Sequence, residues 1–566
     1  MPFILRRARR TEMASSRSLM DVVKSKIAFG NNTHEKQELN IRECSSYNVQ
    51  LPKPSGNLPE RGYHQSRQHD GLYQASHRIT QLPVELLAYI FVLGAEDDTR
   101  LPMVISHVCR AWRVVALNTP SLWRHVSLDS RNIMWHERIW RAKACTLDVE
   151  LIPQAPAGRR AARRTYLDAR SVESYMHLVT PYIPRWKSLR IEFQHYAPYL
   201  LSAALSACCA ADEAVQAEML ENISLVHPQN DDSQEFFLFN GYAPRLRSVT
   251  LQGVRLAWTP SLFGNLSVLD YTHHGFTSGQ DAFFELFGML KVSSNLQELR
   301  LAFPPYAYRN LHFPDSEVPP KASIHLDKLQ RLTLFVGADD IPSALLQLVS
   351  RLHMRDLRSL SLLATPPSLG PPQHRHYREL LKNLPPPFHR LRTFFKALPR
   401  LAQLSHFRIE HSWCDPSFVL GLLEFHVPQL KHLALASTHI TDSFLWALGE
   451  KLRGRHYYVG HLDMQKQVPG VWHNGPVTLS TLETIEVSGA QISSEGLVSV
   501  VRRMLSGGIQ WVDEVRIKDC AGVDSGVIER AGRFGVTVRV WIDDVEMHEG
   551  DDDSGLSRSK WKKLYK

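Results

Sequence analysis

The chain has 566 residues, 43% of them hydrophobic, and a formal charge of +9. This composition is ordinary for a soluble globular protein, and the length allows several domains or one elongated repeat array. No apolar run approaches the roughly 20 residues of a membrane-spanning helix, and the seven cysteines show neither a C-x-x-C pair nor the histidine spacing of a zinc site. We therefore expect no membrane partner, no metal and no cofactor, and a cytoplasmic and/or nuclear location.

Residues 1–77 lack sustained hydrophobic periodicity and are rich in Arg, Ser, Asn, Gln and His. Such a segment cannot bury enough apolar surface to order itself, so we expect a disordered basic N-terminal extension. Its arginine-rich start leaves a mitochondrial transit peptide open as an alternative. Other basic residues gather at 159–164 and near the C-terminus rather than among aromatic side chains on a folded face, so no nucleic-acid partner is expected.

Residues 78–128 are predicted to form a small all-α unit of three helices. Pro83, Pro102 and Pro120 stand where a helix can begin without losing a hydrogen bond, and the second helix is expected to run from Pro102 through Trp112. The first helix repeats apolar residues along one side at Leu82, Leu86, Ile90 and Leu93. A unit this small has too little mass to bury all of these side chains, which indicates a partner surface.

The motifs Leu82-Pro83, Ile90-Phe91, Val108-Cys109-Arg110, Trp112 and Leu122-Trp123 follow one another in this unit. They resemble the F-box, the three-helix motif that docks a substrate receptor onto the Skp-type adaptor of a cullin ubiquitin ligase. The stretch Gly94 to Arg100 departs from the family pattern, since it predicts a longer and more acidic interhelical loop. The resemblance implies an adaptor-binding set of Leu82, Pro83, Leu86, Ile90, Phe91, Val108, Cys109, Trp112, Leu122 and Trp123.

Residues 129–180 form a junction between this unit and the rest of the chain. The sequence predicts a helix around Ile139 and Trp140, a strand over 145–151 by its alternation, and a basic loop at 158–164. We interpret the junction as the atypical first turn of a repeat array, which needs a cap.

From Trp186 onward the pattern L-x-x-L-x-L returns many times, as in Leu246-Val249-Leu251, Leu296-Leu299-Leu301 and Leu430-Leu433-Leu435. Each instance predicts a short strand with one buried edge in a stacked array. Helices with hydroxyl or carboxylate caps are expected between strands, for example after Thr441-Asp442 and after Ser493-Ser494.

This region resembles a leucine-rich-repeat domain of the irregular kind that often follows an F-box. The usual Asn or Cys after the last leucine is replaced by residues such as Glu192, Gln252 and Ala302. We expect an α/β solenoid over 181–545, with a Pro-rich insertion near 364–390 and a charged C-terminal tail over 546–566. The whole order and spacing resembles fungal F-box proteins of mushroom-forming species.

The sequence offers no catalytic constellation. It contains no phosphate-binding loop, no H-E-x-x-H and no G-x-S-x-G elbow, while His273-His274 and His374-Arg375-His376 lack a third ligand. We expect a non-catalytic receptor that brings an unknown target protein to a cullin ligase core through exposed strand residues. The candidate target-binding residues are Arg190, Arg247, Arg300, Arg331, Arg408 and Arg516, which could equally be solubilising.

Two other readings remain open at this point. The array could be a protein-binding scaffold with no connection to a ligase, its three helices serving as an N-terminal cap. The Pro-rich insertion could also hold an unrecognised hydrolase, which turnover surviving the removal of residues 1–180 would support.

Overall fold

The structure is a computed structural model. It describes residues 82–128, 134–153, 167–194, 196–209, 216–277, 279–303, 322–336, 341–363, 391–398, 401, 403–410, 419, 430–448, 482–506, 512–520, 522–524, 526–542 and 545–547. The predicted N-terminal extension, the basic 158–164 loop, the Pro-rich insertion near 364–390 and the tail beyond 547 lie outside these residues, so their assignments stay predictions.

The described chain divides into two compact units. The first unit holds the residues up to Val126 together with Met134–Cys145, and the second holds Ser127, Leu128 and the residues from Thr146 onward. The short strand β1 (His125–Ser127) spans the boundary between them. The expected junction helix is therefore part of the first unit.

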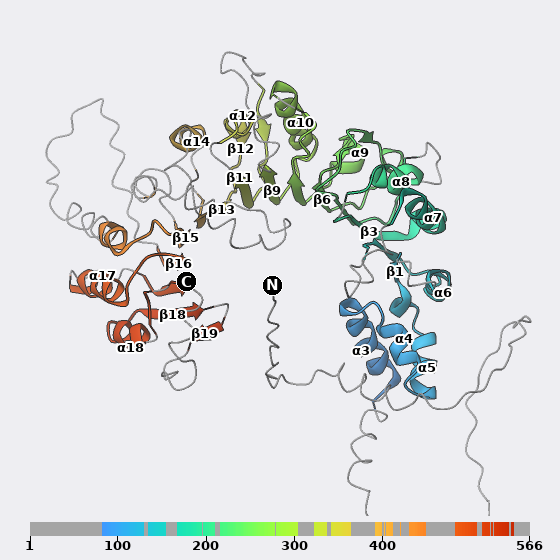
Figure 1. Ribbon diagram of the computed structural model, residues 1–566, viewed down its shortest axis with the longest axis horizontal. Helices are drawn as coiled ribbons and strands as arrows, with labels where there is room; N and C mark the ends of the chain where they lie inside the picture. The colour runs from blue at the N-terminus through green and yellow to red at the C-terminus, as the bar shows by residue number, and fades with distance from the viewer. Residues whose placement is uncertain are drawn as a thin grey trace, which may run out of the picture. The chain divides into compact units, whose positions relative to one another are not determined.

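The first unit is helical. Figure 1 shows α3, α4 and α5 in blue and side by side. Its elements are α3 (Val84–Asp97), α4 (Leu101–Ser106), α5 (Arg110–Leu117), the 3-10 turn η1 (Pro120–Trp123) and α6 (Trp135–Arg141). Each proline start is used, since α3 follows Pro83 directly and both α4 and η1 carry proline in their first turn.

The single helix expected from Pro102 through Trp112 is wrong, because the chain forms two helices there. Helix α4 ends at Ser106, and Cys109 adopts an extended backbone with φ −157° and ψ 169°. The Cys109 Sγ then accepts the Trp112 backbone N–H at 3.4 Å and caps α5.

The long loop expected from Gly94 is also corrected, since α3 continues to Asp97. Gly94 lies against the start of α4, where an added Cβ would approach the Leu101 side chain to 2.5 Å. The absence of a side chain at position 94 therefore lets α3 and α4 pack closely.

The second unit is an α/β region built on a long, mainly parallel sheet. Its strands are β2 (Leu147–Leu151), β3 (Trp186–Glu192), β4 (Asn222–Val226), β6 (Ser248–Gln252), β8 (Val268–Thr272), β9 (Glu298–Phe303), β11 (Arg331–Val336), β13 (Ser359–Leu363), β14 (His406–Glu410), β15 (His432–Ala436), β16 (Thr484–Ser488), β17 (Glu514–Lys518), β18 (Thr537–Ile542) and β19 (Val545–Met547). They pair in this order, all in parallel except β18 with β19.

The leucine motifs place their apolar residues in register across this sheet. Leu189 of β3 pairs with Ile223 of β4, which pairs with Val249 of β6, and the row continues through Leu269 and Leu299. All five side chains are buried. A single strand would leave these apolar side chains in water. Their burial against the side chains of the next strand therefore stabilises the stack.

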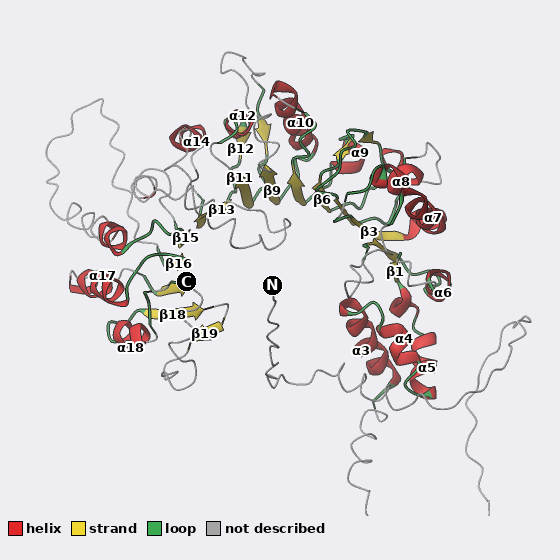
Figure 2. Ribbon diagram, viewed as in Figure 1, coloured by secondary structure: helices red, strands yellow, loops and turns green. Residues whose placement is uncertain are grey.

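Helices alternate with the strands along the chain (Figure 2). They are α7 (Ala169–Val179), η2 (Thr180–Arg185), α8 (Leu200–Leu205), η3 (Ser206–Cys208), η5 (Phe239–Gly241), α9 (Pro260–Phe263), α10 (Gly279–Val292), α12 (Ser343–Val349), α14 (Leu391–Ala397), α17 (Ser494–Ser506) and α18 (Gly526–Gly532). Two small parallel pairs add β5 (Glu235–Phe236) with β7 (Arg255–Leu256), and β10 (Ile324–His325) with β12 (Leu352–His353). Among the described helices, none is long and apolar enough to cross a membrane.

A cap of the expected kind starts α17. The Ser493 hydroxyl accepts the Gly496 backbone N–H at 2.9 Å and donates to the Asp442 carboxylate at 2.7 Å. Asp442 also accepts the Ser493 backbone N–H at 2.8 Å. One carboxylate thus ties the start of α17 to a segment 51 residues earlier in the chain.

Candidate functional site

Helix α3 carries apolar side chains on two faces. Leu87, Phe91 and Ala95 point into the unit and are buried. On the other side lie Leu82, Leu86, Tyr89, Ile90 and Leu93, at helical spacing and between 37% and 61% exposed. We call these five residues the α3 stripe. A contiguous row of large apolar side chains in water is typical of a surface that binds another protein.

Helix α5 also exposes apolar side chains. Val114 is 52% and Leu117 is 38% exposed, one turn apart, while Trp112, Val115 and Ala116 are buried. The sequence analysis missed both exposed residues. The signal was present, because Val114 and Leu117 lie beside Arg110 and Arg113 on the polar side of α5.

Four members of the predicted adaptor-binding set lie inside the unit rather than on its surface. Phe91, Trp112, Leu122 and Trp123 are buried, and the rings of Phe91 and Trp112 pack with centroids 4.9 Å apart. Their placement makes them core residues of the unit. Of the remaining predicted residues, Leu82, Pro83, Leu86, Ile90 and Cys109 are exposed and Val108 is half-buried.

Helix α6 completes the first unit through a buried arginine. The Arg138 guanidinium donates to the His125 carbonyl at 2.9 Å and to the Thr99 carbonyl at 2.5 Å. Burial lowers the pKa of Arg138 to about 10, against the opposing effect of Asp98. Arg141, one turn on, lies 4.4 Å from the centre of the Trp123 ring. The sequence analysis placed a helix here but did not foresee that its arginines face inward.

The predicted target-binding arginines occupy different register positions on the strands of the main sheet. Arg190, Arg300, Arg408 and Arg516 share one register position, on β3, β9, β14 and β17 respectively. Arg331 lies two positions earlier, paired with Glu298 in the strand register.

Arg247 stands apart from the other five. It precedes β6 and donates to the Asn265 carbonyl at 3.1 Å. Five of the six arginines therefore lie within the strands of the main sheet, at the same register position or two positions away from it. Arg247 lies outside the strands.

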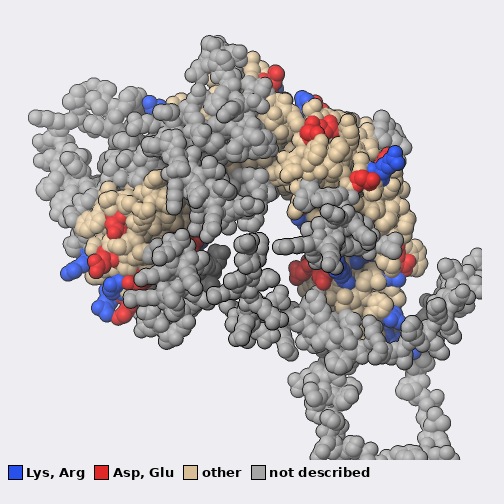
Figure 3. Space-filling model, viewed as in Figure 1, with Lys and Arg blue, Asp and Glu red and all other residues tan. Residues whose placement is uncertain are grey.

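Each arginine on this face has a carboxylate beside it. Arg190 lies 2.7 Å from Glu192, Arg408 lies 2.6 Å from Glu410, and Arg516 lies 2.7 Å from Glu514. Figure 3 likewise shows basic and acidic side chains next to one another on the described surface. The face therefore offers alternating charges, which suits a protein surface better than a phosphate polymer.

Two arginines hold the carboxylate of Glu298 on the strand face. Burial favours its neutral form, but hydrogen bonds from Arg331 and Arg300 outweigh burial and hold the pKa of Glu298 below its usual value. Both arginines contact it, Arg300 at 2.6 Å. Glu298 thus fixes the positions of two predicted target-binding residues.

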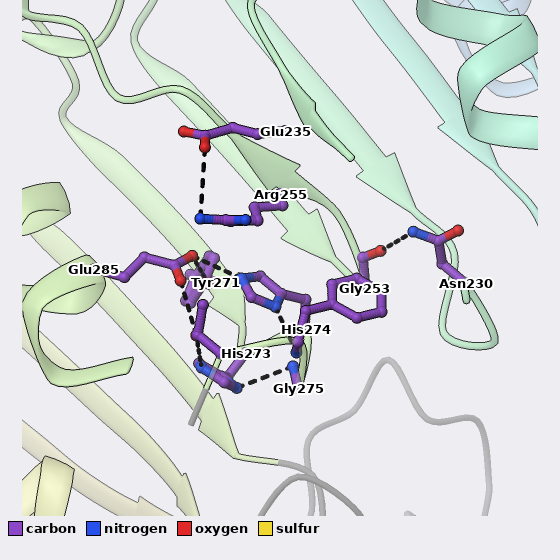
Figure 4. Close-up of polar contacts among 11 residues, drawn as sticks. Asn230, Glu235, Gly253, Arg255, Tyr271, His273, His274, Gly275 and Glu285 are labelled. Atoms are coloured by element: carbon purple, nitrogen blue, oxygen red, sulfur yellow. Dashed lines mark hydrogen bonds and ion pairs between the residues drawn. The ribbon is translucent and has the colours of Figure 1, made fainter. Parts of the chain in front are cut away.

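A polar cluster lies beyond the end of β8, where His273 and His274 follow Thr272 (Figure 4). His274 accepts the Phe276 backbone N–H on Nδ1 at 3.0 Å, which assigns the proton to Nε2. That Nε2 lies 2.6 Å from the Glu285 carboxylate. The carboxylate also accepts the Thr277 hydroxyl at 2.8 Å.

Burial and hydrogen bonding set the ionisation states of His273 and Glu285 in this cluster. Burial lowers the pKa of His273 to about 4, so its ring stays neutral at physiological pH. Burial would raise the pKa of Glu285, but its bonds to His274 and Thr277 outweigh burial and keep the carboxylate ionised. Hydrogen bonds within the cluster hold the two imidazole rings and the Glu285 carboxylate in place.

The described residues also include candidate metal ligands and thiols. No group of three or more His, Cys, Asp or Glu side chains among them could hold a metal ion. The paired His374 and His376 lie outside the described residues. Burial raises the pKa of Cys209 and Cys520 to about 11, so these thiols stay protonated and are poor nucleophiles.

Comparison with known proteins bears on the first unit. No curated protein sequence matches the chain. Among solved structures, the chain is similar to one described as "Crystal structure of Rad7 and Elc1 complex in yeast", with 12% sequence identity and a TM-score of 0.29, over 84% of this chain and 98% of that chain. A likeness that distant carries no argument here. An F-box-like family model matches residues 79–129, so the chain carries an F-box-like segment that contains the whole α3 stripe.

Proposed function

We propose that this chain is an F-box substrate receptor whose first unit docks onto the Skp-type adaptor of a cullin-RING ubiquitin ligase. The observation that carries the proposal is the α3 stripe, an exposed apolar row inside the segment that the F-box-like model matches. An isolated unit gains nothing by exposing five large apolar side chains, whereas a partner that covers them gains apolar burial.

In this proposal the second unit is an irregular leucine-rich-repeat solenoid of the fungal F-box type, which recruits a target protein. Support comes from the parallel strands paired in chain order and from the alternating charges on their exposed positions. The receptor is a non-catalytic subunit in the cytoplasm and/or nucleus. It holds the target near a ubiquitin-charged partner, so that proximity replaces a bimolecular encounter.

The test of docking compares two exposed positions on α3. Ile90→Ala removes a side chain of the α3 stripe, and Val84→Ala removes an exposed side chain of the same helix outside it. Hot-spot side chains contribute roughly 2–4 kcal/mol to binding, so Ile90→Ala should weaken the affinity of the full chain for a purified Skp-type adaptor at least tenfold. Val84→Ala should change that affinity less than threefold.

Thermal unfolding of both variants serves as the control for folding, since neither side chain is buried. A change below threefold for Ile90→Ala in a folded protein would contradict the docking proposal. Absence of any adaptor binding by the unmodified chain would favour the alternative of a protein-binding scaffold whose helices only cap the array.

A further inference from the structure

An exposed aromatic surface lies in the second unit, at the loop between β3 and α8. Tyr196 is 51% and Tyr199 is 70% exposed. The Tyr196 hydroxyl donates to the Asp231 carboxylate at 2.7 Å, and its backbone N–H donates to the Gln229 side chain at 2.9 Å. The ring of Tyr196 is therefore held in place although it faces water.

The adjacent loop supplies a second carboxylate. Asp232 accepts the hydroxyl of Ser202, which lies in the first turn of α8, three residues after Tyr199. Its backbone N–H donates to the Asn230 side chain at 3.2 Å. We call Tyr196, Tyr199, Asp231 and Asp232 the tyrosine–aspartate corner. Its parts come from two segments more than 30 residues apart that hydrogen bonds join.

The charge around this corner is negative. The sequence has no Lys or Arg between Arg190 and Arg245, although it contains several acidic residues there and the chain as a whole carries +9. The groups that act on the Tyr196 hydroxyl are Asp231 and Tyr199, and the bond to Asp231 raises the pKa of Tyr196. A cation that approaches the corner therefore meets an attractive field from Asp231 and Asp232.

We propose that the tyrosine–aspartate corner binds an arginine-bearing peptide segment of a partner protein. The exposed faces of Tyr196 and Tyr199 suit a guanidinium stacked on the ring, and the two carboxylates pair with its N–H groups. An uncharged proline-rich segment would use the rings but leave the carboxylates unused. This surface differs from the α3 stripe, so its test is independent of adaptor docking.

The probe is a fluorescein-labelled Gly-Ser peptide that contains four arginines, with a matched peptide in which glutamine replaces each arginine. Fluorescence anisotropy follows binding to the full chain. We expect the arginine peptide to bind measurably more tightly than the glutamine peptide, and added salt to weaken it. A proline-rich peptide of equal length should bind no better than the glutamine peptide.

Three variants locate the site. Tyr199 has a left-handed backbone with φ +60°, so Tyr199→Asn removes the ring with a residue that tolerates this conformation. Asp231→Asn removes one charge at constant shape. Each should weaken binding of the arginine peptide about threefold to fivefold. Phe284→Ala removes an exposed ring on α10 and should leave binding unchanged.

The proposal is overturned if folded Tyr199→Asn and Asp231→Asn bind the arginine peptide like the unmodified chain. Equal binding of the glutamine peptide, stronger binding of the proline-rich peptide, or an equal loss in Phe284→Ala would overturn it as well. Thermal unfolding checks the fold of every variant. If Tyr199→Asn fails to fold, Asp231→Asn still tests the proposal, because it changes an exposed side chain without changing its shape.

Discussion

The indole Nε1 of Trp123 donates a hydrogen bond to the backbone carbonyl of Ala116 at 2.8 Å, and both residues are completely buried. This bond joins η1 to the last turn of α5. Since the guanidinium of Arg141 covers the same ring at 4.4 Å, Trp123 is the point where η1, α5 and α6 meet. A residue in this position stabilises the unit that presents the docking surface.

Trp123→Ala should therefore lower stability before it changes binding. Truncation of a buried tryptophan costs about 3–5 kcal/mol, and the lost hydrogen bond to the Ala116 carbonyl adds to the destabilisation. Chemical denaturation of the full chain should show a destabilised first transition. Adaptor binding, measured where the variant is still folded, should fall no more than threefold. A tenfold loss of affinity without loss of stability would show that Trp123 contacts the adaptor directly.

Local patterns were enough to predict several helical starts and most strands of the main sheet, but neither the separate start of α5 nor the strands β18 and β19. Proline marks the start of α3, α4 and η1. Leu299 with Leu301, and Leu332 with Leu334, show the two-residue period that a strand places on one face. The burial of Trp123 and Leu122 could not be predicted this way. In a small unit, the local sequence around an apolar side chain is the same whether that side chain faces the core or a partner. Only the packing of α5 and α6 shows that Trp123 and Leu122 face the core.

Arg138 illustrates a second limit of sequence reasoning. From the sequence alone, Arg138 next to Glu137 is expected to be a solvated charge, yet its guanidinium is buried and donates to two backbone carbonyls. Those acceptors come from Thr99 and His125, both distant in sequence. The sequence does not indicate which carbonyls Arg138 binds, because every residue has a backbone carbonyl that can accept a hydrogen bond.

The polar cluster predicts an acid-sensitive fold. The folded pKa of His273 lies near 4 because of burial, below its ordinary value of 6.5. Above pH 6.5 the ring is neutral in both states; as pH falls from 6.5 to 4, only the unfolded chain takes up the proton, so stability is lost across this window. The loss should reach on the order of 3 kcal/mol. Glu285, whose folded pKa is also lowered, acts in the same direction at the acid end of the window.

Urea unfolding at several pH values checks this expectation. His273→Asn keeps an acceptor for the Gly275 backbone N–H but does not titrate, so its stability should depend less on pH between 6.5 and 4. His177→Asn changes an exposed histidine of α7 and should reproduce the curve of the unmodified protein. Parallel curves for His273→Asn and the unmodified protein would contradict the assignment.

Gly253 should tolerate no side chain. Its φ is +69°, and an added Cβ would come within 2.1 Å of the His227 carbonyl oxygen, part of the backbone after β4. Gly253→Ala should therefore destabilise the second unit by at least about 2 kcal/mol. Gly288, in the interior of α10, meets nothing within 4 Å of an added Cβ, so Gly288→Ala should be neutral or stabilising by up to about 1 kcal/mol. Equal effects of the two substitutions on denaturant midpoints would refute this account of Gly253.

Leu117 tests how far the docking surface extends beyond the α3 stripe. With Val114 it forms an exposed apolar pair on α5, and a partner that covers only α3 would leave this pair in water. If the adaptor covers both helices, Leu117→Ala should weaken its affinity by about 1–2 kcal/mol, or roughly fivefold to thirtyfold. The measurement is calorimetric titration of the full chain with adaptor. Ala111→Ser, at another exposed position of α5, should leave affinity unchanged. Unaltered affinity in Leu117→Ala, together with a tenfold loss in Ile90→Ala, would confine docking to α3 and leave the α5 pair to a different partner.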